Sequence, residues 1–184
     1  DCPSEKPATR REARRRSRHE AILEVAARSF LEQGYDGTTM SAIAGILGGS
    51  KGTLWSYFPS KDVLFAAVID QATAAFREQL LLILNPHDEV TIALHRFCDE
   101  FLRKIISPEA IALYRLVMGE ASRFPEVGRI FHERAPNQTR ILLADYLSAA
   151  MGRGQLRRDD PLRAARELIG LCMCGSHGER LLGL

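Results

Sequence analysis

The segment TMSAIAGILGGSKGTLWSYFPSK, residues 39–61, contains two short helical patterns separated by glycines. Apolar residues in its first half recur at i, i+3, i+4 and i+7, which gives a short helix one apolar face. These residues are Met40, Ile43, Ala44 and Leu47. Thr39 is placed to cap the start of this helix. Gly48 and Gly49 end it, because glycine tolerates the left-handed backbone conformation.

The second half of the segment predicts another short helix. Ser50 is placed to cap it, and Leu54 and Phe58 lie four residues apart and face inward. Two short helices joined by a glycine turn form a helix-turn-helix. The outward face of the second helix carries small, hydroxyl-bearing, aromatic and cationic groups and no acid. Its residues are Lys51, Gly52, Thr53, Trp55, Ser56 and Tyr57. Such a face suits the major groove of DNA.

The longer run GYDGTTMSAIAGILGGSKGTLWSYFPSKDVLF, residues 34–65, resembles the N-terminal domain of TetR-type transcriptional regulators. The glycine-tyrosine pair, the threonine cap, S-K-G-T-L and F-P-S-K-D occur in the order and at the spacing of that family. The resemblance is strong over residues 18–66. Residues 112–134, ALYRLVMGEASRFPEVGRIFHER, resemble the ligand domain of one branch of the family. The resemblance implies a homodimeric DNA-binding regulator with three helices followed by six.

The resemblance also implies roles for single residues. The implied phosphate contacts are Thr39, Trp55, Tyr57 and Lys61. The positions where the family reads base edges are Ser50, Lys51, Gly52 and Ser56. The chemistry of these side chains is compatible with that division, since lysine, hydroxyl and indole groups donate to phosphate oxygens and glycine allows close backbone approach. The alternative for Trp55 and Tyr57 is that they belong to the core.

The formal net charge of +2 hides a local concentration of positive charge. Six arginines within residues 10–18 are opposed only by Glu12, and they are Arg10, Arg11, Arg14, Arg15, Arg16 and Arg18. Such a run alone is also typical of a solvated tail. Beside a helix-turn-helix, residues 1–17 are expected to form a flexible basic arm that follows the DNA backbone or enters the minor groove. The expected contacts are Arg14, Arg15, Arg16 and Arg18.

Punctuation by proline and glycine divides the rest of the chain into helices. The first helix is expected over about 18–33, which sets the helix-turn-helix domain at 18–60. A long helix from 61 to about 84 links it to a second domain, 61–184. Five more helices are expected at about 88–106, 108–121, 126–133, 137–151 and 161–182. No segment alternates with period two, so the fold class is all-α: a three-helix helix-turn-helix domain followed by a roughly six-helix ligand-binding and dimerisation domain.

Aromatic and sulfur-containing side chains with few polar groups in the second domain describe either a core or a pocket for an apolar or aromatic molecule. The candidate pocket residues are Phe76, Leu80, His95, Cys98, Phe101, Tyr114 and Met118. The helix over 137–151 is apolar nearly all round, so its own domain can cover one side and a second copy the other. The expected homodimer interface is a four-helix bundle containing Ile141, Ala144, Leu147, Met151, Leu168, Ile169, Cys172 and Met173.

Other classes of function find little support in the sequence. The cysteines lack zinc-site spacing, so we expect no metal or cofactor, and we interpret them as small buried hydrophobes rather than as a redox or metal sensor. GGSKGT has the wrong order for a phosphate loop and no strand is expected before it, which argues against an enzyme. No apolar run is long enough to cross a bilayer, and we expect a cytoplasmic protein without a membrane partner.

The sequence therefore predicts a regulator, expected to be a repressor, that binds double-stranded operator DNA. Its affinity is expected to change when a small apolar or aromatic effector binds the second domain. The alternative is an all-helical protein-interaction module with no DNA or effector function. That alternative leaves the arginine run and the acid-free helix face unexplained.

Overall fold

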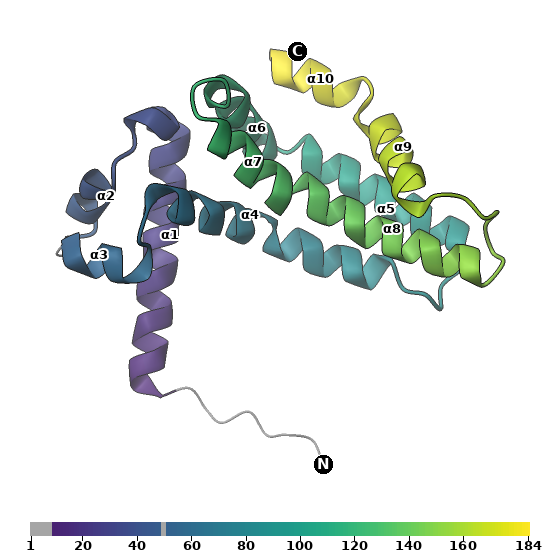
Figure 1. Cartoon of the computed structure of the whole chain (residues 1–184), viewed down its shortest axis with the longest axis horizontal. Helices are drawn as coiled ribbons and strands as arrows, with labels where there is room; N and C mark the ends of the chain where they lie inside the picture. The colour runs from purple at the N-terminus through teal and green to yellow at the C-terminus, as the bar shows by residue number, and fades with distance from the viewer. Residues whose placement is uncertain (1–8, 49–50) are drawn as a thin grey trace. The chain divides into compact units, whose positions relative to one another are not determined.

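The computed structural model describes residues 9–48 and 51–184, which fold into helices joined by short connections (Figure 1). The helices are α1 (Arg10–Gly37), α2 (Met40–Ile46), α3 (Lys51–Tyr57), α4 (Lys61–Ile83), α5 (Val90–Ile105), α6 (Pro108–Glu120), α7 (Pro125–Arg134), α8 (Pro136–Gly152), α9 (Pro161–Met173) and α10 (Ser176–Leu182). These described ranges contain no strand. The predicted all-α fold class is confirmed.

The chain divides into two compact units within α4, after Val68. Unit 1 contains α1 to α3 and the first turns of α4, and unit 2 contains the rest of α4 and α5 to α10. The sequence analysis predicted the domain boundary at residue 60, directly before the start of α4. The first turns of α4 belong to unit 1 because the buried ring of Phe65 packs edge-on against Phe30 and Tyr35, with centroid distances of 5.1 and 5.4 Å.

Gly34 and Tyr35 shape the end of α1. Gly34 has a φ of 75°, a left-handed value that interrupts the helix where the sequence places a stop. Tyr35 then folds back, as expected, and stacks on Phe30 with the ring centroids 5.7 Å apart. The Tyr35 hydroxyl donates a hydrogen bond to the carboxylate of Asp62 in the first turn of α4. This short segment therefore joins α1 to α4 in the core of unit 1.

The start of α1 corrects the expectation of a flexible arm over residues 1–17. The helix begins at Arg10, well before residue 18, because Thr9 and Glu12 form a capping box. The Thr9 hydroxyl accepts from the Glu12 N–H at 3.3 Å, and the Thr9 N–H donates to Glu12 Oε2 at 2.7 Å. That backbone hydrogen bond holds the pKa of Glu12 below its usual value. Residues 10–17 are helical, and residues 1–8 of the predicted arm lie outside the described part of the chain.

Unit 2 is built around the buried rings of Phe97 and Phe101, which stack at 5.7 Å, and a layer of leucines from α8. The helix predicted over 161–182 is two helices. Gly175, with a φ of 93°, separates α9 from α10. Arg115 of α6 then satisfies the carbonyls at the end of α10, with Nη2 2.8 Å from the Arg180 oxygen. The break escaped the sequence analysis because this stretch keeps a helical apolar pattern on both sides of the glycine.

Two cysteines meet in unit 2. Cys98 of α5 and Cys172 of α9 are half-buried against the same core, and they lie close to one another. Burial, reinforced by this contact, raises the pKa of Cys98 to about 12. The thiolate is the reactive form, so the raised pKa makes Cys98 unreactive at neutral pH, whereas Cys174 is exposed and the interpretation of the cysteines as buried hydrophobes stays a prediction. No helix among the described residues is long and apolar enough to cross a membrane.

Candidate nucleic-acid interface and unit 2 cavity

The exposed face of α3 is the first component of the candidate nucleic-acid interface. Leu54 and Phe58 are buried, which turns the opposite face outward. The outward residues are Gly52, Thr53, Trp55 and Ser56, with Tyr57 half-buried beside them. Trp55 is 40% exposed, so it does not belong to the core. Lys51 begins α3, although its side chain lies outside the described atoms, and Ser50 lies outside the described residues.

Local features at the ends of α2 and within α3 agree with the expected helix-turn-helix. Thr39 caps α2 as predicted, with its hydroxyl oxygen accepting from the Ala42 N–H at 3.1 Å. Gly48 has a φ of 62° and lies just beyond the end of α2, where the sequence expects the helix to stop. The Ser56 hydroxyl donates to the Thr53 carbonyl at 2.7 Å, so its oxygen can still accept a hydrogen bond.

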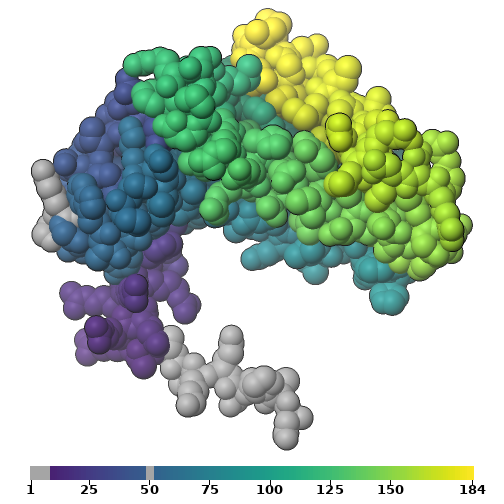
Figure 2. All heavy atoms as spheres, viewed as in Figure 1, coloured from purple at the N-terminus to yellow at the C-terminus, as the bar shows by residue number. Residues whose placement is uncertain are grey.

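A row of arginines on α1 is the second component. Because residues 10–17 are helical, four arginines at i, i+3, i+4 and i+7 share one face. This arginine face consists of Arg11, Arg14, Arg15 and Arg18. Together with Thr53, Ser56 and Tyr57 of α3, it lines a groove of about 1060 Å³. Figure 2 shows the purple first turns of α1 standing out from the blue atoms of α2 and α3.

The arginines of the run have different environments. The Arg15 guanidinium lies 5.9 Å from the centre of the Tyr57 ring, which connects the arginine face to α3. Arg18 is half-buried, and its Nη2 lies 3.4 Å from the Leu47 carbonyl oxygen at the end of α2. Arg16, a predicted contact, is exposed but does not line the groove. Arg14 does line it.

Lys61 is the remaining predicted phosphate contact. Its ammonium donates to the Tyr35 carbonyl at 2.8 Å and lies 4.2 Å from the centre of the Tyr35 ring. The structure thus gives Lys61 a role in holding the start of α4 against the end of α1. A phosphate contact by Lys61 stays a prediction.

The groove carries four arginines and one glutamate along its length, a surplus of three positive charges. Glu12 is occupied by its capping bonds with Thr9. Guanidinium groups bind phosphate oxygens in a two-pronged geometry, and hydroxyl groups add further hydrogen bonds. The arrangement can bind a nucleic-acid backbone along α1 while α3 presents its side chains to base edges.

Unit 2 contains a cavity of about 530 Å³, lined by residues of helices α4, α5, α6, α7, α8 and α9. Its lining comprises Ala72, Thr73, Phe76, Phe101, Lys104, Ile105, Glu109, Ala110, Leu113, Tyr114, Phe131, Ala135, Pro136, Thr139, Arg140, Ile169 and Met173. The size falls within the range of small-molecule sites. Most of these side chains are apolar or aromatic, as the sequence predicted for a pocket.

The structure brings together three of the predicted pocket residues, Phe76, Phe101 and Tyr114. The other four lie elsewhere. Leu80 is buried in the core, and the exposed His95 ring pairs through Nδ1 with the Thr91 carbonyl at 2.8 Å. Cys98 contacts Cys172, and Met118 is 65% exposed. These residues were chosen for their type, and the helices turn them toward different surroundings.

Several lining residues were missed by the sequence analysis. Phe131 of α7 meets Tyr114 edge-on at 4.9 Å, and Lys104 and Arg140 bring positive charge to the lining. Burial raises the pKa of Tyr114, so its phenol stays protonated and can donate a hydrogen bond. Arg140, a charged residue directly before the apolar run 141–144 of α8, was a signal in the sequence that could have pointed here.

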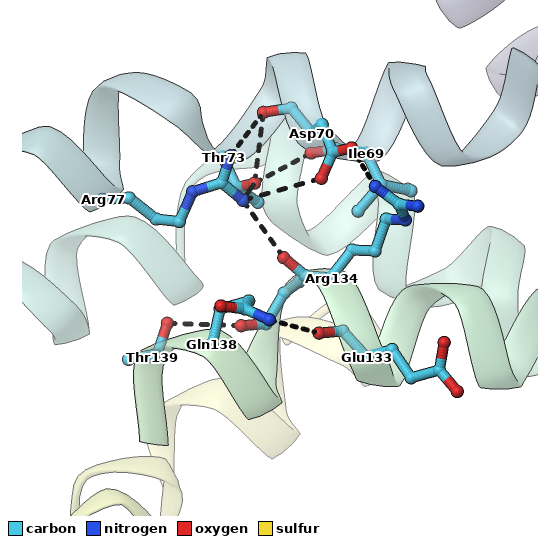
Figure 3. Close-up of polar contacts among 9 residues, drawn as sticks. Ile69, Asp70, Thr73, Arg77, Glu133, Arg134, Gln138 and Thr139 are labelled. Carbon is cyan, nitrogen blue, oxygen red and sulfur yellow. Dashed lines mark hydrogen bonds and ion pairs between the residues drawn. The ribbon is translucent and has the colours of Figure 1, made fainter. Parts of the chain in front are cut away.

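A polar network connects α4 to the junction of α7 and α8 beside the cavity (Figure 3). Arg77 Nη1 donates to the Thr73 hydroxyl at 2.8 Å and to the Arg134 carbonyl at 3.3 Å. Arg134 forms an ion pair with Asp70, one turn before Thr73 on α4. Thr73 also lines the cavity, so the cavity wall and the α4–α7 contact share a residue.

The predicted dimer residues are corrected in part. Ala144, Leu147 and Met151 are buried in the core of their own unit, so their side chains are not available to a second copy. Four residues of α9 are half-buried against the same core, namely Leu168, Ile169, Cys172 and Met173. Ile141 is 39% exposed. A helix that is apolar nearly all round, as α8 is, does not reveal from sequence which face its own domain covers.

Comparison with known proteins identifies both units. Residues 22–68 match the family model for bacterial regulatory proteins of the tetR family. Residues 92–184, half of the chain, match the model for the C-terminal domain of AefR-like transcriptional repressors. This chain belongs to the TetR family. Members of this family are helix-turn-helix transcriptional regulators, which are DNA-binding transcription factors rather than enzymes.

Individual TetR-family proteins show the same relationship. The flavonoid-responsive regulator FrrA is 34% identical with a TM-score of 0.78, over 91% of this chain and 85% of FrrA. A TetR-family regulator from Mesorhizobium loti MAFF303099 is 25% identical with a TM-score of 0.77, over 95% and 86% of the two chains. RutR from Escherichia coli strain K12 is 32% identical over 47% of this chain, and the match spans 49% of RutR, about half its length.

Proposed function

We propose that this TetR-family chain is a repressor that binds operator DNA as a two-fold homodimer and is controlled by a small molecule in the unit 2 cavity. The observation that carries the DNA-binding part is the arginine face of α1, which lines one groove with the acid-free outward face of α3. Family members bind operator DNA and usually act as dimers with small-molecule effectors. The place of action is then the bacterial cytoplasm, where operator DNA lies.

The arginine face of α1 and the outward face of α3 are proposed to contact different parts of the DNA. The outward residues of α3 enter the major groove, with Lys51, Gly52 and Ser56 as the candidate base contacts. The arginine face follows the phosphates beside that groove. A dimer places two copies of α3 one DNA turn apart, roughly 34–36 Å, so a modest change in spacing weakens both half-sites together.

An Arg15→Gln variant tests the arginine face against a matched control, Arg16→Gln, taken from outside the groove. Removing one phosphate contact should flatten the dependence of log K on log salt by about 0.9 per protomer. Arg15→Gln is expected to show this change and to weaken binding equally for all sequences, whereas Arg16→Gln keeps the original slope. The measurement is fluorescence anisotropy with genomic fragments selected by the protein, from low to moderate salt. Equal slopes for the two variants would contradict the assignment.

The proposed dimer uses the outward stripes of α8 and α9. On α8 this stripe contains Ile141, Asp145, Ser148, Ala149 and Gly152, and on α9 it contains Gly170 and Leu171. Small residues let helices approach closely, and Leu171 is 74% exposed in the single chain. Two helices from each copy then form a four-helix bundle.

A Leu171→Asp variant is expected to weaken the dimer by at least about 100-fold, because each carboxylate buried without a partner costs several kcal/mol. The matched control is Met118→Asp, which places the same charge on an exposed apolar residue of α6 outside these stripes. Sedimentation velocity at micromolar concentration measures the result. A stable dimer in the Leu171 variant would exclude this face as the interface.

Control of DNA binding is proposed to pass through α4, which contributes residues to both units. Thr73 lines the cavity and accepts a hydrogen bond from Arg77, which also holds the Arg134 carbonyl at the end of α7. A ligand that binds one arrangement of this network more tightly shifts the equilibrium between the two arrangements of α4. The size of the shift is set by the difference between its affinities for the two arrangements. Couplings of about 1–3 kcal/mol change DNA affinity some 5–150-fold.

A further inference from the structure

The unit 2 cavity contains a charge that the surrounding residues do not satisfy. Arg140 of α8 lines the cavity, and its Nε atom is buried without a hydrogen-bond partner. Nη1 of the same side chain lies 3.4 Å from Asn137 Oδ1, a long contact one turn away on α8. Within the part of the chain that the structure describes, Arg140 forms no ion pair. A guanidinium group stays charged in proteins, so it needs an anion or water here.

The geometry of the side chain identifies the kind of anion. Asn137 lies on the Nη1 side, so the edge formed by Nε and Nη2 is the one without a protein partner among the described residues. This edge carries two parallel N–H donors, which match the two oxygens of a carboxylate. A neutral hydroxyl or carbonyl group offers these donors a single oxygen and no negative charge.

Other polar groups of the lining add to this preference. Lys104 donates from Nζ to the Ala72 carbonyl at 3.1 Å and brings a second positive charge. Glu109 is the one acidic residue of the described lining, and it is exposed. The Tyr114 hydroxyl, which stays protonated, is a further donor. The lining therefore carries more cationic donors than acids, and the surplus favours a negatively charged ligand.

The apolar part of the lining sets the rest of the ligand. Rings from three different helices, those of Phe76, Phe101 and Phe131, form part of the wall, and α9 adds Ile169 and Met173. An enclosure of about 530 Å³ holds a molecule with a bulky apolar body rather than a small polar anion. Free phosphate or acetate would leave these rings without a partner surface.

We propose that the ligand of this cavity is an organic carboxylate with a bulky apolar body, and that the guanidinium group of Arg140 binds its carboxylate. The proposal rests on the proposed effector function and narrows the chemical class of the effector. The carboxylate is the shared feature, and the body is either a fused aromatic ring system or an alkyl chain.

Matched pairs of ligands test the charge directly. Isothermal titration calorimetry on the full chain compares naphthoate with naphthyl methanol, and decanoate with decanol. For the ligand pair whose apolar body fits the cavity, the acid is expected to bind at least about tenfold tighter than its alcohol. Hydrogen bonds between two charged groups are stronger than hydrogen bonds to a neutral hydroxyl. The pair that binds identifies the body as aromatic or alkyl. Equal affinities for acid and alcohol would overturn the proposal.

Variants connect the preference to Arg140. Arg140→Gln is expected to remove the preference for acid over alcohol, and Arg140→Lys to retain part of it. The control is Arg103→Gln, next to Lys104 on α5 but outside the lining, which should keep the full preference. An acid preference that survives in Arg140→Gln would assign the charge to another group and reject the role of Arg140.

Thermal stability without ligand separates a binding role from a structural one. Arg140→Met removes a buried nitrogen that has no partner among the described residues, so its unfolding temperature is expected to equal or exceed that of the unchanged protein. A large loss of stability would show that Arg140 supports the fold instead. If acid binds through Arg140 but DNA affinity does not change, the carboxylate site stands and the effector function fails. If neither acids nor alcohols bind, the carboxylate proposal fails.

Discussion

A Thr53→Glu variant is expected to lose operator binding by more than about 100-fold while keeping its fold. Thr53 is exposed on α3 and lines the groove opposite the arginine face. A carboxylate at this position would meet DNA phosphates and neutralise part of the positive surface. Like charges brought together at an interface cost several kcal/mol, which corresponds to a loss of this size.

Thr53→Gln is the matched control, because it adds a side chain of similar size without charge. It is expected to weaken binding by less than about tenfold. Anisotropy titrations with the same selected operator fragment give both affinities, and circular dichroism confirms that both variants are helical. If glutamate and glutamine at residue 53 weaken binding equally, the electrostatic description of this groove is wrong.

A Phe65→Ala variant is expected to destabilise unit 1 by about 3–5 kcal/mol, the usual cost of removing a buried phenyl ring. Phe65 of α4 is fully buried and meets the rings of Phe30 and Tyr35 edge-on. Its loss leaves a cavity at the point where α1, the Gly34 turn and α4 meet. We expect unit 1 to unfold first, with loss of DNA binding.

The single tryptophan, Trp55, lies in unit 1 and reports this change by fluorescence during urea unfolding. Val63→Ala is the control, because Val63 is exposed on the same helix and its removal should change the free energy of unfolding by no more than about 0.5 kcal/mol. A Phe65 variant with the same midpoint as the Val63 variant would show that the aromatic cluster contributes little.

The helix-turn-helix was predictable from sequence because its signals are local. Thr39 as a cap, Leu54 and Phe58 four residues apart and glycines at the turn each act within one or two helical turns. The capping box of Thr9 and Glu12 is equally local and was visible in T-R-R-E. The sequence analysis gave more weight to the charge of the arginine run than to this capping box. It therefore predicted a flexible arm where the structure has a helix.

The cavity and the outward faces of unit 2 could not be derived in the same way. Phe76 and Leu80 lie one turn apart on the same stripe of α4, yet Phe76 lines the cavity and Leu80 is buried in the core. Leu147 and Leu171 are both apolar residues of the last helices, and only the second is exposed. These differences depend on how the helices pack, which periodicity within one helix does not determine.

The capping box at Thr9 has a thermodynamic consequence for DNA binding. A disordered arm loses conformational entropy when it is ordered on DNA, and such coupled folding adds a large negative heat-capacity change. The first turns of α1 are helical without DNA, so this entropy has already been lost in the free protein. Calorimetry should therefore give a heat-capacity change that matches the rigid contact area alone. Selection of the operator is then sensitive to phosphate spacing along the duplex, because the arginines are held at the fixed intervals of a helix.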